Sequence, residues 1–419
     1  LFIPGLVALL SDAVGFVTLL LIDIGVIREQ AVGASMGVAV TILTNLILLP
    51  VLLSFTGISQ EAARRHIIEH DATIHKLGID RLWNSLDRFT ERRWAVLAIA
   101  VATALTVLAL VERSKLQVGD LHAGSPELRP DSRYNKDNAF ITSNFGVSSD
   151  VFAVMIKTPA DQCGTYEVLV EADRLAWLLS QVPGVQGTAS LADTVRAYTS
   201  GGFEGSPKWY TISDNKGIVW PQVNNALVWN SQFLNSECSL TPVLAYLSDH
   251  KAATLNAVVK VANEFAEQRS VDERQFLLAA GSAGIEAATN IVVKSVQLEM
   301  LLAVYAAVAL LCLLTFRSWR AVLVAILPLI LTSLLAEALM VQLNIGLKVA
   351  TLPVVALGVG VGVDYALYLL SVQLEGQRMG LTLQQAYRRA IQFTGKMVAL
   401  VGVTLAVGVV TWMWSPIKF

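Results

Sequence analysis

Seven long apolar segments constrain this chain more than any other feature of its sequence. A helix needs about 20 apolar residues to cross the hydrocarbon core of a bilayer, and each segment is long enough to do so. The composition agrees, since 54% of the 419 residues are hydrophobic and only 15% are charged, which is unusual for a soluble domain. We therefore expect a polytopic α-helical membrane protein that crosses the bilayer at residues 3–22, 31–53, 94–112, 297–316, 320–343, 349–372 and 396–414.

The distribution of lysine and arginine predicts the orientation of these spans. Short cytoplasmic loops are enriched in both residues. The short loops on the opposite side hold only Arg28 and Lys348, with Lys418 at the end of the chain. The loops assigned to the cytoplasm carry seven at 54–93, two at 317–320 and four at 373–396. The polar insert at 113–294 is therefore expected outside the cytoplasm.

This insert has the pattern of a folded α+β domain. Strand-like segments and amphipathic helical segments alternate in it, and they form two strand–helix units. Two such units predict two small subdomains of ferredoxin-like type. Residues 198–237 are rich in Gly, Ser, Asn and Trp and are expected to form loops. The predicted strands are 151–157, 242–247 and 274–281, and the predicted helices are 166–181 and 251–268.

Two of the three cysteines, Cys163 and Cys238, lie in the insert, and Cys312 lies in a predicted span. Only the first two can pair with each other. An oxidising compartment such as a periplasm permits this disulfide. Two free thiols are the open alternative, because the sequence does not show whether the two Cα atoms lie close together.

Residues 55–93 form a charged, amphipathic segment that is expected to lie along the cytoplasmic surface as a linker. His66 and His70 have the i, i+4 spacing of a helical metal site, and His75 follows, but no cysteine or zinc-protease pattern accompanies them. We expect a solvated linker and predict no metal site. The chain starts at Leu1 inside an apolar segment without a charged leader, which indicates a fragment of a longer protein.

A short repeat connects the first and last predicted spans. Residues 13–18 (AVGFVT) and 406–411 (AVGVVT) agree at five of six positions, at an offset of 393 residues. Both helices are expected to run outward from the cytoplasm. A true repeat would indicate two parallel halves related about the membrane normal, as in several transporters.

One acidic residue, Asp364, interrupts a stretch that is otherwise apolar enough to cross a bilayer. A carboxylate at the centre of a spanning helix costs about 2.5–3.5 kcal/mol, so such residues face a bundle interior or a wet cavity and mark an ion or proton route. The alternative is a neutral acid that only tethers helices. Gly358, Gly360 and Gly362 precede Asp364. The i, i+4 spacing of Gly358 and Gly362 predicts a flat helix face that another helix can approach closely.

Other polar residues at similar depth are candidates for the same route. Thr404 lies about as deep in the last span as Asp364 does in its own, so it could hydrogen-bond the carboxyl; a bond to its own helix backbone is the alternative. Tyr365 adjoins the acid and Tyr368 lies one turn beyond it. Asp12, in the first span beside Ser11, is a weaker candidate for a relay position.

The chain resembles the resistance-nodulation-division (RND) superfamily, in particular its branch of MMPL-like lipid exporters and sterol-sensing-domain-like permeases. Residues 358–365 (GVGVGVDY) are similar to the Gly-x-x-x-Asp-Tyr signature of the tenth helix, and 11–16 with 33–50 are similar to helices five and six. The resemblance implies helices five and six at 1–54, a linker at 55–93, helix seven at 94–112, a periplasmic porter domain at 113–294, and helices eight to eleven at 295–419.

By this resemblance the complete protein is a twelve-helix permease of the bacterial inner (cytoplasmic) membrane that exports a hydrophobic or lipid-like substrate at the expense of inward proton flow. Asp364 and Tyr365 match the proton-relay pair of the family. The drug-efflux branch has a Lys at this place, so the Asp-Tyr pair favours the lipid-type branch.

The expected partners are protons, a hydrophobic small molecule or lipid, the bilayer, further copies in a dimer or trimer, and a periplasmic or outer-membrane protein. No nucleic-acid partner, cofactor or enzymatic activity is expected, since the sequence has no nucleophile elbow, Walker loop or kinase signature. A non-transporting sterol or lipid sensor of the same architecture is the main alternative. An accessory of protein secretion is disfavoured, because it would need six spans per polypeptide.

Overall fold

The structure is a computed structural model that describes residues 2–57, 88–125, 127–145 and 148–415. Most of the predicted linker, with His66, His70 and His75, lies outside the described residues. The chain divides into two units, which are described separately below. The helical unit comprises Leu1–Leu116 and Val292–Ser415, and the α+β domain comprises Gln117–Ile291.

Long apolar helices build the helical unit, as the sequence predicts. Six helical stretches of the described chain are long and apolar enough to cross a membrane, and the first predicted span is a shorter apolar helix, Gly5–Leu21. The bounds are α1 (Phe2–Thr18), α2 (Gly25–Leu43), α3 (Leu49–Thr56), α6 (Arg92–Arg113), α12 (Gly281–Phe316), α13 (Trp319–Gln342), α14 (Leu352–Arg378), α15 (Leu383–Ala390) and α16 (Lys396–Val410). A π-helical turn, Thr44–Leu48, joins α2 to α3.

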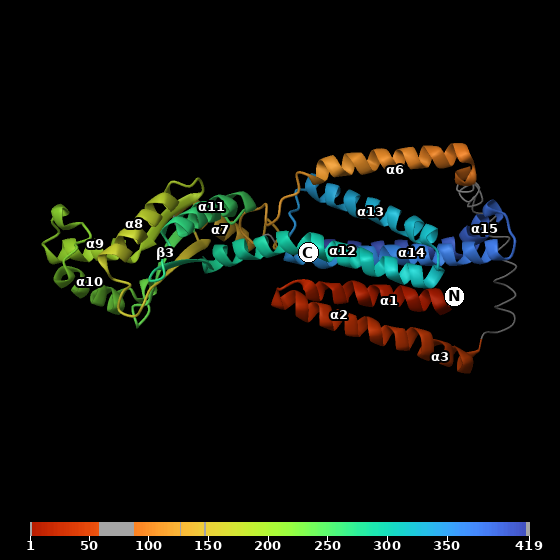
Figure 1. The fold of residues 1–419 in the computed structure, drawn as a ribbon, viewed down its shortest axis with the longest axis horizontal. Helices are drawn as coiled ribbons and strands as arrows, with labels where there is room; N and C mark the ends of the chain where they lie inside the picture. The colour runs from red at the N-terminus through yellow and green to blue at the C-terminus, as the bar shows by residue number, and fades with distance from the viewer. Residues whose placement is uncertain (1, 58–87, 126, 146–147, 416–419) are drawn as a thin grey trace. The chain divides into compact units, whose positions relative to one another are not determined.

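Within this unit, α1 packs beside α2 and α14, and α13 packs beside α6 and α14 (Figure 1). The outward faces of the helices carry large apolar side chains. In α6, for example, Val96, Ile99 and Leu108 are all more than half exposed. Such surfaces suit a hydrocarbon environment, in which the helical backbone satisfies its own hydrogen bonds.

A buried ion pair joins α6 to α13. The Nε atom of Arg113 lies 2.6 Å from Oε2 of Glu337, whose side chain is only 4% exposed. Gln297 of α12 donates a second hydrogen bond to the same carboxylate, at 3.2 Å. Burying a carboxylate is tolerable only when such partners compensate it, so this pair fixes how α6, α12 and α13 meet.

The segment at 373–396, predicted as a loop, is largely helical. α14 continues to Arg378, and α15 begins after Thr382, whose hydroxyl accepts from the Gln385 backbone while the Gln385 side chain accepts from the Thr382 backbone. This reciprocal pair is a capping box that stabilises a helix start. Ala386 is buried against Gly376 of α14, where the absence of a side chain leaves room for α15.

Among its described residues, the α+β domain contains one four-stranded antiparallel sheet of order β2-β3-β1-β4. Helix α8 (Tyr166–Ser180) connects β1 to β2, and α11 (Ala252–Arg269) connects β3 to β4. The two predicted strand–helix segments of the insert therefore contribute to one ferredoxin-like sheet. The prediction of two separate subdomains is wrong. The reason is that β3 pairs with both strands of the first unit. The strands are β1 (Val151–Lys157), β2 (Val185–Ser190), β3 (Leu240–Leu247) and β4 (Gln275–Ala280).

One face of this sheet forms the core of the domain. In β1, Phe152, Val154 and Ile156 alternate along the strand and are fully buried. They pack with apolar residues of α8 and α11, including Leu169, Leu175 and Leu255. The alternation explains why this strand was predictable from sequence.

Residues 198–237, predicted as loops, contain further helices. Figure 1 shows α9 (Leu191–Gly202) and α10 (Lys216–Trp229) side by side. The Asn215 side chain caps α10 by accepting a hydrogen bond from the Gly217 backbone at 2.9 Å. Val219, Val223 and Ala226 are buried at helical spacing, a signal that the Gly- and Asn-rich composition obscured. Helix α7 (Arg133–Phe145) completes the domain.

The two cysteines of the domain form a disulfide. The sulfur atoms of Cys163 and Cys238 are 2.00 Å apart and their Cα atoms 5.0 Å apart. Both residues are buried. The bond joins the loop after β1 to the loop before β3, 75 residues apart in sequence.

Candidate functional site

Asp364 lies on the face of α14 that packs against α1. The Ser11 hydroxyl lies 3.2 Å from Oδ1 of Asp364 and 2.6 Å from the Ala8 carbonyl of its own helix. Ser11 is 1% exposed. A polar side chain of the first span therefore contacts the intramembrane acid directly.

A second carboxyl group, that of Asp12, adjoins the same face. A Cβ added to Gly360 would lie 2.6 Å from Oδ1 of Asp12, so the absence of a side chain at Gly360 leaves the space that this carboxyl occupies. Oδ1 is buried and has no hydrogen-bond partner among the described residues. Gly360 is one turn before Asp364, which puts the two carboxyl groups in one polar site between α1 and α14.

Three successive turns of α14 build this face. Gly360 faces Asp12, Asp364 faces Ser11, and the Tyr368 hydroxyl lies 3.8 Å from the position of a Cβ on Gly5. In these contacts the residue numbers increase along α14 while they decrease along α1, so the two helices are antiparallel. We refer to Ser11, Asp12, Asp364 and Tyr368 as the carboxyl site.

The three glycines before Asp364 have different neighbours. Gly360 accommodates Asp12 of α1, whereas a Cβ on Gly362 would lie 2.5 Å from a methyl group of Leu329 in α13. Gly358 is exposed, and a Cβ there would meet nothing within 4 Å. Gly358 and Gly362 therefore do not form one packing face. Instead, Gly360 contacts α1 and Gly362 contacts α13, because residues two positions apart on a helix point in different directions.

Tyr365 and Thr404 have no described contact with Asp364 or Asp12. The Tyr365 hydroxyl lies 3.8 Å from the position of a Cβ on Gly402 of α16. Thr404 is exposed, and its hydroxyl donates to the Leu400 carbonyl of its own helix at 2.7 Å. Of the two alternatives for Thr404, the structure therefore shows the bond to its own helix backbone. The hydrogen bond to Asp364 comes from Ser11, because α1 packs on the face of α14 that carries the acid.

The carboxyl site brings two acidic groups together with few compensating contacts. Two neighbouring carboxyl groups in a low-dielectric interior cannot both be ionised at low cost. The described contacts supply one hydroxyl donor and no cationic side chain.

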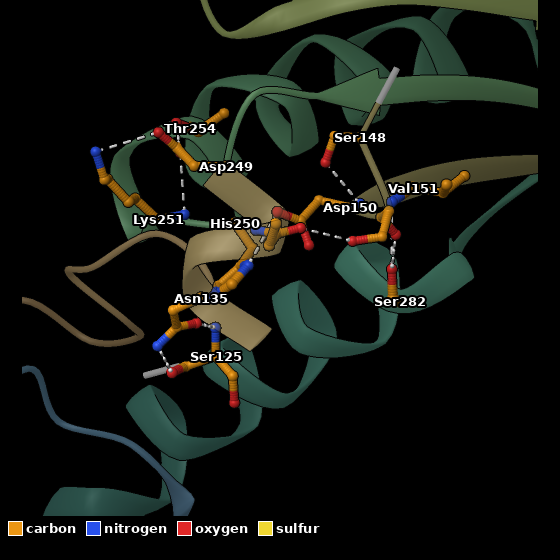
Figure 2. Close-up of polar contacts among 12 residues, drawn as sticks. Ser125, Asn135, Ser148, Asp150, Val151, Asp249, His250, Lys251, Thr254 and Ser282 are labelled. Carbon is orange, nitrogen blue, oxygen red and sulfur yellow. Dashed lines mark hydrogen bonds and ion pairs between the residues drawn. The ribbon is translucent and has the colours of Figure 1, made fainter. Parts of the chain in front are cut away.

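A second polar cluster lies in the α+β domain and was not predicted. Ligand atoms of Asp120, His250 and Glu286 lie within 4.8 Å of one another. Nδ1 of His250 lies 3.1 Å from a carboxylate oxygen of Asp150 (Figure 2). Burial alone lowers the pKa of His250, but the hydrogen bond to Asp150 and the charges of Glu286, Asp150 and Asp120 outweigh it and raise this pKa to about 8. The three residues are far apart in sequence, so no spacing pattern indicates them.

Comparisons with known proteins agree with this architecture. The sequence profile of the MMPL family matches residues 239–419. Among solved structures, the fold is similar to the cryo-EM structure of the hedgehog release protein Disp from the water bear Hypsibius dujardini, with a TM-score of 0.56 and 14% sequence identity. No curated protein sequence matches the chain.

The similar structure is a longer protein. The match covers 93% of this chain and 51% of that one, so the chain spans about half the length of the protein that it matches. At 14% identity the likeness shows a shared fold only. It confirms the prediction of a polytopic helical membrane protein that also contains an α+β domain.

Proposed function

We propose that this chain, whose residues 239–419 match the sequence profile of the MMPL family, is part of an RND-type membrane exporter driven by the proton-motive force. The substrate in this proposal is a hydrophobic or lipid-like molecule. The protein acts in the bacterial inner membrane, and the α+β domain captures the substrate on the periplasmic side. The distribution of lysine and arginine among the loops supports this orientation.

The single observation that carries the proposal is the carboxyl site. An acid inside a spanning helix is costly, and it is retained where it moves ions or protons. Here Asp364 is accompanied by a second carboxyl group, Asp12, on the neighbouring helix, with one oxygen that no described residue satisfies. Neither group has a cationic partner among the described contacts, unlike Glu337, which is paired with Arg113. A structural acid that stays ionised inside a bilayer would need such a cationic partner.

Ser11 provides a way to couple the proton to the helices. A serine hydroxyl has one proton to donate and also accepts hydrogen bonds. When Asp364 is ionised, Ser11 donates to it. When Asp364 is protonated, the acid donates to Ser11, and Ser11 donates to the Ala8 carbonyl 2.6 Å away. Protonation thus reverses the hydrogen bond between α1 and α14, and this reversal is the local event that we link to transport.

The test is transport by the full-length protein in proteoliposomes with an imposed pH gradient and a fluorescent phospholipid as probe. We expect Asp364→Asn to express and fold normally and to abolish gradient-dependent movement of the probe. Asp23→Asn is the matched control, because Asp23 is exposed and pairs with Arg28. It is expected to transport normally.

Two results would decide against the proposal. Normal gradient-dependent flux in Asp364→Asn would remove the proton role of this residue. Binding of the probe by the wild-type protein without any flux would favour the alternative of a lipid or sterol sensor.

A further inference from the structure

We propose that Asp120, His250 and Glu286 of the α+β domain form a binding site for a divalent transition-metal ion of the zinc type. One atom of each residue lies within 4.8 Å of an atom of each of the other two. His250 is buried, and the two acidic residues are half-buried. This cluster shares no residue with the carboxyl site.

Three separate segments supply the three residues. Asp120 follows Gly119, whose φ of +112° and lack of a side chain let the chain pass against Asn290 of α12 and Ala252 of α11. The Asp120 carbonyl also accepts from the Ala252 backbone at 2.8 Å. His250 precedes α11, and Glu286 lies in the second turn of α12. A bound ion would therefore connect the first segment of the domain to its last helix.

The surroundings of His250 are those of a metal-binding histidine. Its Nδ1 atom is held at 3.1 Å by the carboxylate of Asp150, which leaves Nε2 as the ligand atom of the ring. Histidines that bind metals almost always donate their second ring nitrogen to such a carboxylate or carbonyl group. The backbone of Asp150 is itself held in place. Its N–H donates to the Ser148 hydroxyl (Figure 2), and its carbonyl accepts from the Leu247 backbone.

Glu286 gives a second, independent indication. Its Oε1 atom is buried and has no hydrogen-bond partner among the described residues. A buried carboxylate oxygen without a partner is costly, and most such atoms in folded proteins are satisfied by a side chain, a water molecule or an ion. A cation bound between Asp120, His250 and Glu286 would satisfy it.

The donor set indicates the class of metal. One imidazole and two carboxylates suit zinc and neighbouring divalent ions better than calcium or magnesium, which prefer oxygen ligands alone. Ligands bind zinc at about 2.0–2.2 Å, so two ligand atoms of a tetrahedral site are about 3.4 Å apart. Closing the cluster from 4.8 Å requires side-chain movements of about 1 Å, with water as a fourth ligand.

The test uses the full chain, purified in detergent and stripped with EDTA. Three of its five histidines, His66, His70 and His75, lie in the linker and could bind zinc themselves, so all three are changed to alanine in the background. Titration with zinc chloride in a calorimeter is expected to show one tight site per chain. Cobalt(II) in place of zinc is expected to give the absorption bands of a four- or five-coordinate ion.

Substitutions in the cluster then identify the ligands. Glu286→Gln and Asp120→Asn, which keep the shape of the side chains, are each expected to weaken zinc binding by more than about 100-fold. Asp150→Asn is expected to weaken it by about 10- to 100-fold, as changes to the partner of a metal-binding histidine do. His122→Ala is the control, because His122 is exposed and lies two residues from Asp120. It is expected to have no effect.

The melting temperature in EDTA shows whether each variant is folded, and zinc is expected to raise it in the background but not in Glu286→Gln. The proposal is overturned if the background binds no zinc. It is also overturned if folded Glu286→Gln and Asp120→Asn bind zinc as tightly as the background does.

Discussion

Replacing Gly360 by alanine probes the contact between Asp12 and α14 without removing a titratable group. The added Cβ would lie 2.6 Å from Oδ1 of Asp12 and 3.6 Å from its Cα. Ordinary contacts of this kind are no closer than about 3.4 Å, so the carboxyl group must move by close to 1 Å. It must move away from α14, on which Asp364 lies one turn further along.

The magnitude follows from two opposing effects. Overpacking a tight contact costs about 1–3 kcal/mol. Alanine also stabilises a helix by about 0.5–1 kcal/mol relative to glycine. Gly358→Ala gains the same helix term, but its Cβ meets nothing within 4 Å. The difference in unfolding free energy between the two variants therefore isolates the packing cost. We expect Gly360→Ala to be less stable than Gly358→Ala by about 1 kcal/mol or more. The difference is expected to be close to about 1 kcal/mol if rotation of the Asp12 side chain relieves the contact.

Function is expected to be affected more than stability, because Asp12 moves relative to Asp364. The assay is thermal unfolding in detergent together with gradient-dependent transport in proteoliposomes. Gly358→Ala should match or exceed the wild type in stability and should transport normally, whereas Gly360→Ala should lose most of its transport. Equal stability and equal transport in the two variants would show that the contact between Asp12 and Gly360 does not exist.

Three further predictions follow from the structure. Arg113→Ala leaves the buried Glu337 carboxylate without its cation and is expected to destabilise the protein by about 3 kcal/mol in thermal unfolding, whereas Arg113→Met combined with Glu337→Leu should restore most of this loss. Changing Cys163 and Cys238 to serine opens a loop of about 75 residues and is expected to lower the unfolding free energy by about 2–5 kcal/mol; alkylation of the wild type without reductant should label neither residue. Thr404→Val removes only a hydrogen bond to the Leu400 carbonyl and should leave transport intact. Loss of transport in this variant would indicate that Thr404 takes part in proton transfer.

Much of the fold could be predicted from local sequence patterns. Long apolar runs indicate the spanning helices, and the alternation of Phe152, Val154 and Ile156 indicates β1. What local patterns cannot show is which strands pair. Two strand–helix units could form two sheets or one, and only the pairing of β3 with both β1 and β2 decides it. Likewise, the polar sequence of α15 is typical of a loop. Its helix is stabilised by packing of Ala386 on Gly376 of α14, which the local sequence does not show.

The candidate site was predictable to a similar degree. Asp364 is evident because its cost in a bilayer is large, whatever its neighbours are. Its partners depend on helix packing. An argument from depth alone selects Thr404, but depth does not tell which helix faces the acid, and the structure puts Ser11 and Asp12 there. The cluster of Asp120, His250 and Glu286 could not be predicted from the sequence at all, because only the tertiary fold brings these distant residues together.

The central claim is that the Asp364 carboxyl binds and releases a proton during transport. Infrared difference spectroscopy of the full-length protein in membranes tests it directly, because a protonated carboxyl group absorbs separately from a carboxylate. Titration across the physiological pH range should show such a band disappear as the pH rises, and Asp364→Asn should remove it. A spectrum in which no band that depends on Asp364 changes with pH would contradict the account.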